Sequence, residues 1–340
     1  MRLLLAPHRF AWFALVAYVC VPLTSAGVAE PGSVLVFPVQ VDDQARITII
    51  SVTNTNTTPQ NPQSFGGSTR VHYQYLTTTP NPGNPLEPTH CVVNNRYEFL
   101  TPADTLSVRA KCHNPMDPGQ GGYLVASAVS PTGGTWTHNY LTGSLLVLYA
   151  SGASYTMNAI PFKGMPAPGQ LTDLNSNGRL DFDGAEYEGV SDHLLMDTFL
   201  AAANHNLTLI NLTGRAGDLH TVGLSIWNDN EFPLSTSLSF KCWFNQPLPR
   251  ISSLFTDSFL KNATPDDPEE LDFQCNGRGL LETGWVRIDS MGVVTEGGFP
   301  VADDGALIGA VTSSRHSTVA VGRQLWGSEA RQLNGSAINP

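Results

Sequence analysis

The segment from Asp173 to Glu186, here called the oxygen-rich loop, gathers carboxylate and amide side chains around a glycine. Counted from Asp173, side-chain oxygens stand at positions 1, 3 and 5, and Gly178 at position 6 permits the sharp turn that directs such oxygens to one centre. A backbone carbonyl at position 7 and an acid at position 9 continue the pattern. An oxygen-only set favours Ca²⁺ over transition metals, and its size favours Ca²⁺ over Mg²⁺. The predicted metal ligands are Asp173, Asn175, Asn177, Arg179 through its carbonyl, Asp181, Asp183 and Glu186.

The end of the oxygen-rich loop departs from the usual calcium loop. Through Asp181 it resembles the loops of EF-hand and dockerin proteins, and that resemblance implies a bidentate acid at position 12, where Gly184 stands. Glu186 replaces that acid if the loop is longer by two residues, and Asp183 replaces it if the loop is tighter. We favour Glu186 because its longer side chain reaches back more easily. The competing interpretation is an Asx- and Gly-rich surface turn that binds no ion.

Motifs of known catalytic sites are mostly absent from the sequence. It contains no phosphate-binding loop, no H-E-x-x-H and no G-x-S-x-G. The segment Ser258–Lys261 matches S-x-x-K, but the S-D-N and K-T-G elements that accompany this motif in penicillin-binding enzymes are missing. The acid pairs Glu269–Glu270 and Asp303–Asp304 are adjacent in sequence, so on a strand they would point to opposite faces. The sequence therefore predicts a non-catalytic protein, with a hydrolase of extracellular glycans or peptides as the alternative.

The first residues carry the three parts of a secretory signal peptide. Arg2 and Arg9 make a basic start, Phe10–Leu23 is almost wholly apolar, and small residues suited to signal peptidase follow. Cleavage near residue 29 removes two arginines and no acid, which changes the net charge from −11 to −13. Such acidity argues against a nucleic-acid partner, because that binding needs a basic surface. Beyond residue 30 no apolar run is long enough to span a bilayer, so we expect a secreted or periplasmic protein with no membrane span after cleavage.

Four cysteines remain after signal cleavage: Cys91, Cys112, Cys242 and Cys275. In an exported chain an even number predicts disulfides, and three connectivities are open. We favour Cys91 with Cys112 and Cys242 with Cys275, because each pair is close in sequence and lies in one half. The alternative is zinc held by the first two cysteines and the histidines adjacent to them, although such spacing does not match a zinc knuckle.

Short β-branched and aromatic runs recur along the chain between turn-rich segments. Only 14% of the residues are charged, whereas 31 glycines and 24 prolines supply turns, so long surface helices are disfavoured. Candidate strands lie between Ser33 and Ala150 and again between Asn206 and Leu325. Ser191–Ala203 has an N-cap and apolar residues at helical spacing, so it is the one short helix expected. The predicted organisation is a signal peptide (1–29), a first β-sandwich (30–150), a linker with the oxygen-rich loop and the helix (151–204), and a second β-sandwich (205–340).

Two short echoes suggest that the halves repeat. Ser51–Asn56 matches Ser225–Asn230, because in both an apolar strand runs into an Asn-x-Asn turn, and Leu141–Ser144 matches Leu325–Ser328. Two matches in the same order favour tandem related domains over chance. The strand and Asn-turn order, together with Leu100–Val108, resembles bacterial immunoglobulin-like modules. That resemblance implies an all-β fold of two tandem immunoglobulin-like sandwiches, and it implies no particular activity.

The functional prediction that remains is binding or structural support. We predict an exported, non-catalytic binding or structural protein with a structural Ca²⁺ site, whose ligand outside the cell is a glycan or a cell-surface protein. Calcium is plentiful outside cells, so the oxygen-rich loop would stay filled and stiffen the connection between the domains. Tryptophans can form sugar-binding platforms. Strand positions place Trp227 and Trp243 in the core, whereas the turn around Trp136 makes that ring the candidate for exposure.

Overall fold

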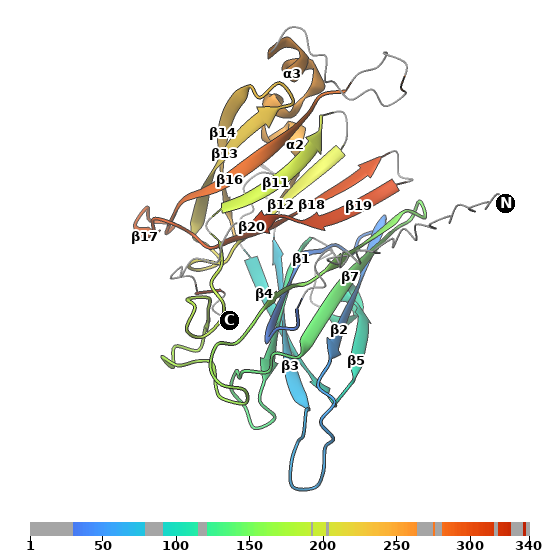
Figure 1. The fold of residues 1–340 in the computed structure, drawn as a ribbon, viewed down its shortest axis with the longest axis vertical. Helices are drawn as coiled ribbons and strands as arrows, with labels where there is room; N and C mark the ends of the chain where they lie inside the picture. Colours follow the sequence, from blue (N-terminus) through green and yellow to red (C-terminus); the bar gives the residue numbers. More distant parts are fainter. Residues whose placement is uncertain are drawn as a thin grey trace, which may run out of the picture.

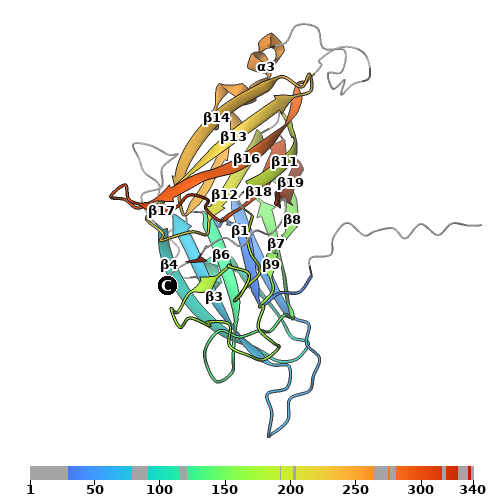
Figure 2. The same ribbon diagram turned by 60° about the vertical axis from the view of Figure 1, so that its left-hand side comes forward.

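The computed structural model describes residues 30–78, 91–114, 121–191, 193–201, 204–263, 275, 281–315, 319–327 and 336–337. Most regular elements are strands, and they form two β-sandwiches that lie one above the other in Figures 1 and 2. The predicted all-β class is confirmed. The predicted signal peptide, 1–29, lies outside the described residues. Within the described ranges, no helix is both long and apolar enough to cross a membrane.

The first sandwich consists of a five-stranded sheet that faces a four-stranded sheet. Its strands are Val34–Gln40 (β1), Arg46–Asn54 (β2), Thr69–Thr78 (β3), Cys91–Leu100 (β4), Thr105–Arg109 (β5), Gly122–Val129 (β6), Leu141–Tyr149 (β7), Ser154–Asn158 (β8) and Ile160–Phe162 (β9). The strand orders are β4-β3-β6-β1-β9 and β5-β2-β7-β8, with all neighbours antiparallel. Large buried side chains such as Phe37, Ile50 and Tyr73 fill the space between the two sheets.

The second sandwich consists of a six-stranded sheet that faces a four-stranded sheet. Its strands are His193–Leu200 (β11), Asn204–Asn211 (β12), Leu219–Asn228 (β13), Pro233–Lys241 (β14), Trp243–Pro247 (β15), Thr283–Val294 (β16), Pro300–Ala302 (β17), Leu307–Arg315 (β18), Val319–Gln324 (β19) and Trp326–Gly327 (β20). The orders are β14-β13-β16-β11-β20, with β17 on β16, and β15-β12-β18-β19. Leu209, Val222 and Phe240 belong to the core between them. Separately, Leu180–Asp181 (β10) pairs with Ser336–Ala337 (β21).

The two sandwiches share one topology. Strands β1 to β9 correspond in order to β11, β12, β13, β14, β15, β16, β18, β19 and β20, and each corresponding pair has the same neighbours. Even the short helices correspond, because Ala110–His113 (α1) follows β5 and Leu248–Ile251 (α2) follows β15. As in the immunoglobulin fold, the second strand pairs with the fifth and the third with the sixth. The first strand, however, pairs with the sixth, and the seventh pairs with the second.

The sequence echoes do not align this structural repeat. Ser51–Asn56 lies at the end of β2, whereas Ser225–Asn230 lies at the end of β13, which corresponds to β3. Leu141–Ser144 begins β7, whereas the segment starting at Leu325 leads into β20, which corresponds to β9. Both matches therefore join strands that are not equivalent. The repeat exists in the strand order, and the short sequence matches are coincidental.

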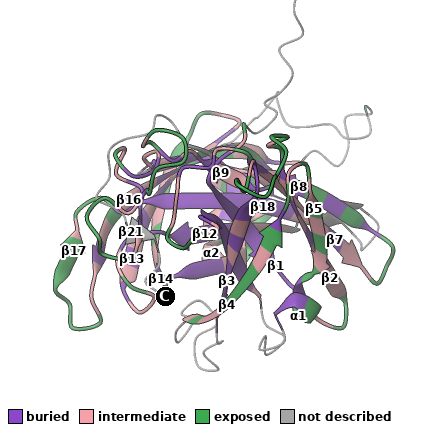
Figure 3. Ribbon diagram, turned by 90° about the horizontal axis from the view of Figure 1, so that it is seen from below, coloured by how far each residue is buried: buried purple, intermediate pink, exposed green. Residues whose placement is uncertain are grey.

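One sheet from each sandwich takes part in the contact between the sandwiches, and its central strands are buried on both faces. We call β4-β3-β6-β1-β9 and β15-β12-β18-β19 the inner sheets, and the other two the outer sheets. Every residue of β1 and β6 is buried, whereas residues of β2 and β13 alternate between buried and half-buried (Figure 3). Side chains of both inner sheets meet in one apolar group, here called the shared cluster. Its members are Val34, Val36, Leu76, Tyr123, Val125, Phe162, Leu180, Phe182, Tyr187, Val190, Ile210, Leu212, Cys242, Trp243, Ala306 and Ile308.

The segment predicted as a linker, 151–204, supplies strands to both sandwiches. Strands β8 and β9 belong to the first sandwich and β11 to the second. The prediction of a helix over Ser191–Ala203 is wrong, because His193–Leu200 is strand β11, paired with β16. A register shift between Met196 and Phe199 leaves both side chains buried, so the interrupted alternation reads like helical spacing in the sequence.

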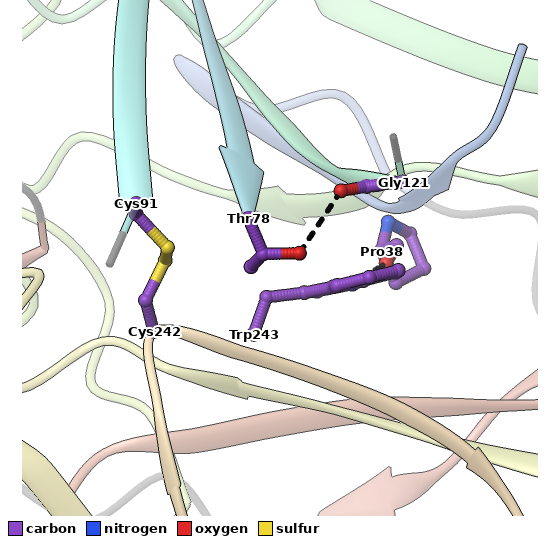
Figure 4. The surroundings of a disulfide bond; sticks show 6 residues. All are labelled: Pro38, Thr78, Cys91, Gly121, Cys242 and Trp243. Carbon is purple, nitrogen blue, oxygen red and sulfur yellow. Dashed lines mark hydrogen bonds between the residues drawn. A yellow bond between two sulfur atoms is a disulfide. The ribbon is translucent and has the colours of Figure 1, made fainter. Parts of the chain in front are cut away.

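The disulfide joins the two inner sheets. Cys91 in β4 is bonded to Cys242, which lies 151 residues away in sequence. The favoured pairings with Cys112 and Cys275 are therefore wrong, and those two cysteines are free and exposed. Next to the disulfide, Nε1 of Trp243 donates a 3.0 Å hydrogen bond to the carbonyl of Pro38 (Figure 4). The prediction assumed that cysteines close in sequence would pair, but the contact between the inner sheets brings together cysteines that are distant in sequence.

Candidate metal site and adjoining groove

The oxygen-rich loop is anchored on the shared cluster. The Phe182 side chain is fully buried, and its ring centroid lies 4.6 Å from that of Phe162 and 5.8 Å from that of Tyr187. The Tyr187 hydroxyl shares a 2.7 Å hydrogen bond with Thr172, just before the loop begins. Both ends of the loop are therefore held by the same core that joins the sandwiches.

Four of the predicted ligands form one hydrogen-bonded group. The Nδ2 atoms of Asn175 and Asn177 each donate to Oδ2 of Asp181 at 2.7 Å. From the start of the loop, Asp173 accepts the backbone amide of Asn177 at 3.0 Å and that of Gly178 at 3.1 Å. Gly178 has a φ of 73°, the left-handed conformation that the sequence pattern requires at this position. The structure thus brings together side chains from both halves of the loop.

Glu186 brings a third carboxylate to this group. Its side chain is only 1% exposed, and its Oε1 accepts the backbone amides of Leu174 and Asn175 at 2.7 and 3.3 Å. Its Oε2 is buried and has no hydrogen-bond partner. Burial raises the pKa of Glu186, and the charges of Asp181 and Asp173 raise it further. A buried anionic oxygen without a donor is unfavourable unless a proton or a cation neutralises it.

The other two predicted ligands bond within the turns of the loop. Oδ1 of Asp183 accepts the backbone amides of Ala185 and Glu186 at 2.8 and 2.9 Å. This turn contains Gly184, whose φ of 80° favours glycine. The backbone amide of Arg179 donates to Oδ1 of Asn177 at 2.8 Å. Asp183 therefore positions the turn that carries Glu186.

The oxygen-rich loop carries the donor types that Ca²⁺ prefers, but its side chains are not arranged around one centre. Within the described residues, no group of three or more His, Cys, Asp or Glu side chains has a geometry that could hold a metal ion. In the loop, Asn177 bridges Asp173 and Asp181 through its two nitrogens. Half a turn of the Asn175 and Asn177 amides would present oxygens in place of nitrogens. It would also break the bonds in which their Oδ1 atoms accept the backbone amides of Asn177 and Arg179 at 3.0 and 2.8 Å. The unpaired oxygen of Glu186 would then complete an oxygen-only set.

A groove of about 250 Å³ opens between the oxygen-rich loop and an inner sheet. Strands β3, β4 and β6 supply one side, and the loop supplies the other. We call it the polar groove, and it is lined by His72, Gln74, Tyr97, Ser127, Val129, Gly134, Thr135, Asp173, Gly178 and Leu180. Tyr97 is 48% exposed, whereas Ser127 is 1% exposed and its hydroxyl has no hydrogen-bond partner. The polar groove thus combines an accessible aromatic edge with an unsatisfied hydroxyl at its base.

An aromatic stack stands at the rim of the polar groove. The rings of His72 and Tyr97 are nearly parallel, with centroids 4.2 Å apart, and the guanidinium carbon of Arg70 lies 5.0 Å from the Tyr97 centroid. Nε2 of His72 shares a 2.8 Å hydrogen bond with Oδ1 of Asn95. Burial lowers the pKa of His72, so its ring is neutral at pH 7.

The groove residues do not form a nucleophile and base pair. Ser127 lies opposite His72 in the pairing of β6 with β3, but no hydrogen bond joins the two side chains, since the Ser127 hydroxyl has no partner. Elsewhere, Lys261 of the S-x-x-K match lies in the short helix α3 (Asp257–Ala263) and forms an ion pair with Asp257 at 3.2 Å. Asp303–Asp304 is an exposed bend, and Glu269–Glu270 lies outside the described residues.

The tryptophans divide between the interface and the surface. The prediction for Trp243 is confirmed, because it is 7% exposed within the shared cluster. The prediction for Trp227 is wrong: it is half-buried on the outward face of β13 and stacks on Trp285 with centroids 4.0 Å apart. Trp285 is 37% exposed. Trp136 is half-buried, and its Nε1 donates to the hydroxyl of Thr69 at 3.1 Å.

No protein-family model matches this chain, and no curated protein sequence matches it significantly. The sequence predicted the polar members of the oxygen-rich loop but not the groove residues His72, Tyr97 and Ser127. Their strands were predicted, and alternation within a strand places His72 and Gln74 on one face. That the loop folds back over this face depends on the shared cluster, for which the sequence carries no local signal.

Proposed function

We propose that this protein is an exported, non-catalytic binding or structural protein in which a Ca²⁺ ion, held by the oxygen-rich loop, braces the junction of the two sandwiches. The observation that carries this proposal is the buried carboxylate of Glu186, whose Oε2 has no donor and whose pKa is raised by burial and by Asp181 and Asp173. A divalent cation would neutralise these charges and take the place of the missing donor.

The residues that would hold the ion come from the whole length of the loop. They are Asp173, Asn175, Asn177, Arg179 through its carbonyl, Asp181 and Glu186. In this assignment Glu186 takes the part of the final acid, and Asp183 orients the turn before it. Because Leu180, Phe182 and Tyr187 lie in the shared cluster, a bound ion would stiffen the contact between the inner sheets.

Two further observations support export and a binding role. The disulfide between Cys91 and Cys242 is compatible with an extracellular location, because disulfides persist in oxidising compartments. The polar groove and the exposed Trp285 are surfaces suited to a glycan or a cell-surface protein. The hydrolase alternative has less support, since the Ser127 hydroxyl is not hydrogen-bonded to a base.

Thermal unfolding with and without a chelator tests the proposed ion. In excess Ca²⁺ we expect a Tm about 5–10 °C above that in chelator, because a ligand present at about 100 times its Kd stabilises the folded state by about 3 kcal/mol. Equal Tm values in the two conditions, with no calcium found by elemental analysis, would contradict the proposal.

Glu186→Gln sharpens this test, because its effect should change sign with calcium. In chelator the variant should unfold at a higher temperature than the wild type, since it removes a buried, uncompensated charge. In calcium it should unfold at a lower temperature than the wild type, since it loses a charged ligand. Asp183→Asn is the matched control and should shift both values by little, because its amide oxygen can still accept the turn amides. A surface turn that binds no ion predicts stabilisation by Glu186→Gln in both conditions.

A further inference from the structure

We propose that the polar groove binds one ring of a neutral saccharide, which lies against the His72 and Tyr97 stack and turns its hydroxyls toward Ser127, Gln74 and Asp173. This inference names a ligand class for the binding role proposed above and rests on that role. It does not require the calcium ion, because His72, Tyr97 and Ser127, on which it rests, belong to the inner sheet and not to the oxygen-rich loop.

The base of the groove calls for a ligand that can both donate and accept hydrogen bonds. Ser127 is 1% exposed and its hydroxyl has no hydrogen-bond partner among the described residues, which is an unfavourable state for a buried polar group. Gln74 is 3% exposed beside it, and Thr135 and Asp173 line the same space. A hydroxyl-bearing ligand would satisfy the Ser127 oxygen and could donate to the Asp173 carboxylate in addition to the two backbone amides that it already accepts.

The rim of the groove suits the apolar face of such a ligand. The His72 and Tyr97 rings are stacked 4.2 Å apart, and Arg70 lies close to Tyr97, so the aromatic surface is held in place. Val129 and Leu180 add aliphatic surface to the lining. A saccharide ring has both C–H faces and hydroxyl edges, which matches a site with one apolar wall and a polar base.

Charge and size restrict the ligand further. Asp173 is the one acid among the lining residues, no Lys or Arg lines the groove, and His72 is neutral at pH 7 because burial lowers its pKa. In the metal-free protein an anionic ligand would therefore meet the Asp173 carboxylate, while Arg70 lies at the rim on Tyr97 and is not a lining residue. The volume of about 250 Å³ is below the usual range for drug-sized ligands and fits a single ring.

Ligand-observed saturation-transfer NMR on the mature protein tests the proposal. The neutral probes are glucose, galactose, mannose and N-acetylglucosamine, and glucuronic acid is the acidic probe. At least one neutral sugar should bind with a Kd in the millimolar range, as expected for so small a ligand. Tyr97→Ala and Ser127→Ala should each weaken this binding by about tenfold. Trp285→Ala, which removes an exposed ring stacked on Trp227 in the second sandwich, should leave it unchanged.

Three results would overturn the proposal. They are no saturation transfer to any neutral probe, tighter binding of glucuronic acid than of glucose, and binding that Trp285→Ala abolishes while Tyr97→Ala preserves it. Because Ser127 is buried, circular dichroism should confirm that its variant folds, and the exposed Tyr97 keeps the test valid if it does not. Repeating the titration in chelator separates the two proposals. Sugar binding in chelator supports the saccharide proposal even if no ion binds to the loop. Absence of saturation transfer in both conditions contradicts the saccharide proposal even if calcium binds.

Discussion

The inner and outer sheets have equivalent topologies but different side-chain patterns. In β13 of an outer sheet, buried Val222, Leu224 and Ile226 alternate with half-buried residues. In β1 and β6 of an inner sheet, every position is buried. The second face of that inner sheet is covered by the other sandwich and by the oxygen-rich loop. The same strand order can therefore form a one-sided or a two-sided sheet, and the sequence of the outward positions decides which.

The sandwiches also contact each other through sheets that do not correspond. The inner sheet of the first sandwich contains β1, whereas its equivalent in the second, the sheet with β11, is an outer sheet. The outward face of the second outer sheet is mixed, because the half-buried Ser225 and the exposed Arg287 lie next to the stacked Trp227 and Trp285.

The largest expected effect comes from Trp243, which lies at the contact between the inner sheets. Trp243→Ala should lower the free energy of unfolding by about 4 kcal/mol, because it leaves a large cavity and removes the hydrogen bond to Pro38. Trp285→Ala on an outer sheet is the control and should cost less than about 1.5 kcal/mol, mostly the loss of stacking on Trp227. Urea unfolding measures the free energy of unfolding of both variants. Equal losses of stability would show that Trp243 does not lie in a packed contact between the inner sheets.

Removing the disulfide should have the next largest effect. The double variant Cys91→Ala and Cys242→Ala should lose about 3 kcal/mol, because the bond closes a long loop in the unfolded chain. Cys112→Ala changes an exposed, free thiol and should have little effect. A reducing agent should bring the wild type to the stability of the double variant. A variant as stable as the wild type under oxidising conditions would argue against this pairing.

Lowering the pH should affect the stability contributed by the sandwich cores and by the oxygen-rich loop in opposite directions. Burial lowers the pKa of His138 and of His220 to about 4, so each favours the folded state above its unfolded pKa of about 6.5 and loses that contribution as the pH falls toward 4. Between pH 7 and pH 5 each histidine should cost about 2 kcal/mol. The raised pKa of Glu186 acts in the opposite direction in chelator, because stability is lost there as the pH rises.

The Glu186→Gln variant in chelator isolates the histidine effect in urea unfolding. With the opposing carboxyl removed, its stability should fall more steeply between pH 7 and pH 5 than that of the wild type under the same conditions. A variant and wild type with parallel pH profiles would show that the Glu186 carboxyl does not titrate differently in the folded state.

Two strands of the outer sheets could be predicted from the sequence almost residue by residue. Arg46–Asn54 and His220–Asn228 show the two-residue alternation of a half-buried strand, and both are strands. Inner strands such as β6 were predicted because of apolar runs, here Gly122–Val129, whereas the short inner strand β9 was not predicted. What covers their second face could not be predicted, because a continuous apolar run does not identify its partner.

The polar residues of the oxygen-rich loop were predictable for a different reason. Calcium-type spacing is local, so Asp173 and Asp181 can be read from the sequence alone. The pairing of Cys91 with Cys242 and the closeness of Tyr97 to Asp173 depend on how the sandwiches and the loop pack. The prediction for strand β11 was wrong for a local reason, because the register shift after Met196 interrupts the two-residue period.

Calorimetric titration of Ca²⁺ into the metal-free mature protein tests the central claim most directly. The oxygen-rich loop predicts one ion per chain for the wild type at calcium concentrations up to about 1 mM, the range of extracellular sites. It also predicts loss of that binding in Glu186→Gln and its retention in Asp183→Asn. No heat of binding in the wild type, or equal binding by the Glu186→Gln variant, would contradict a calcium-braced junction.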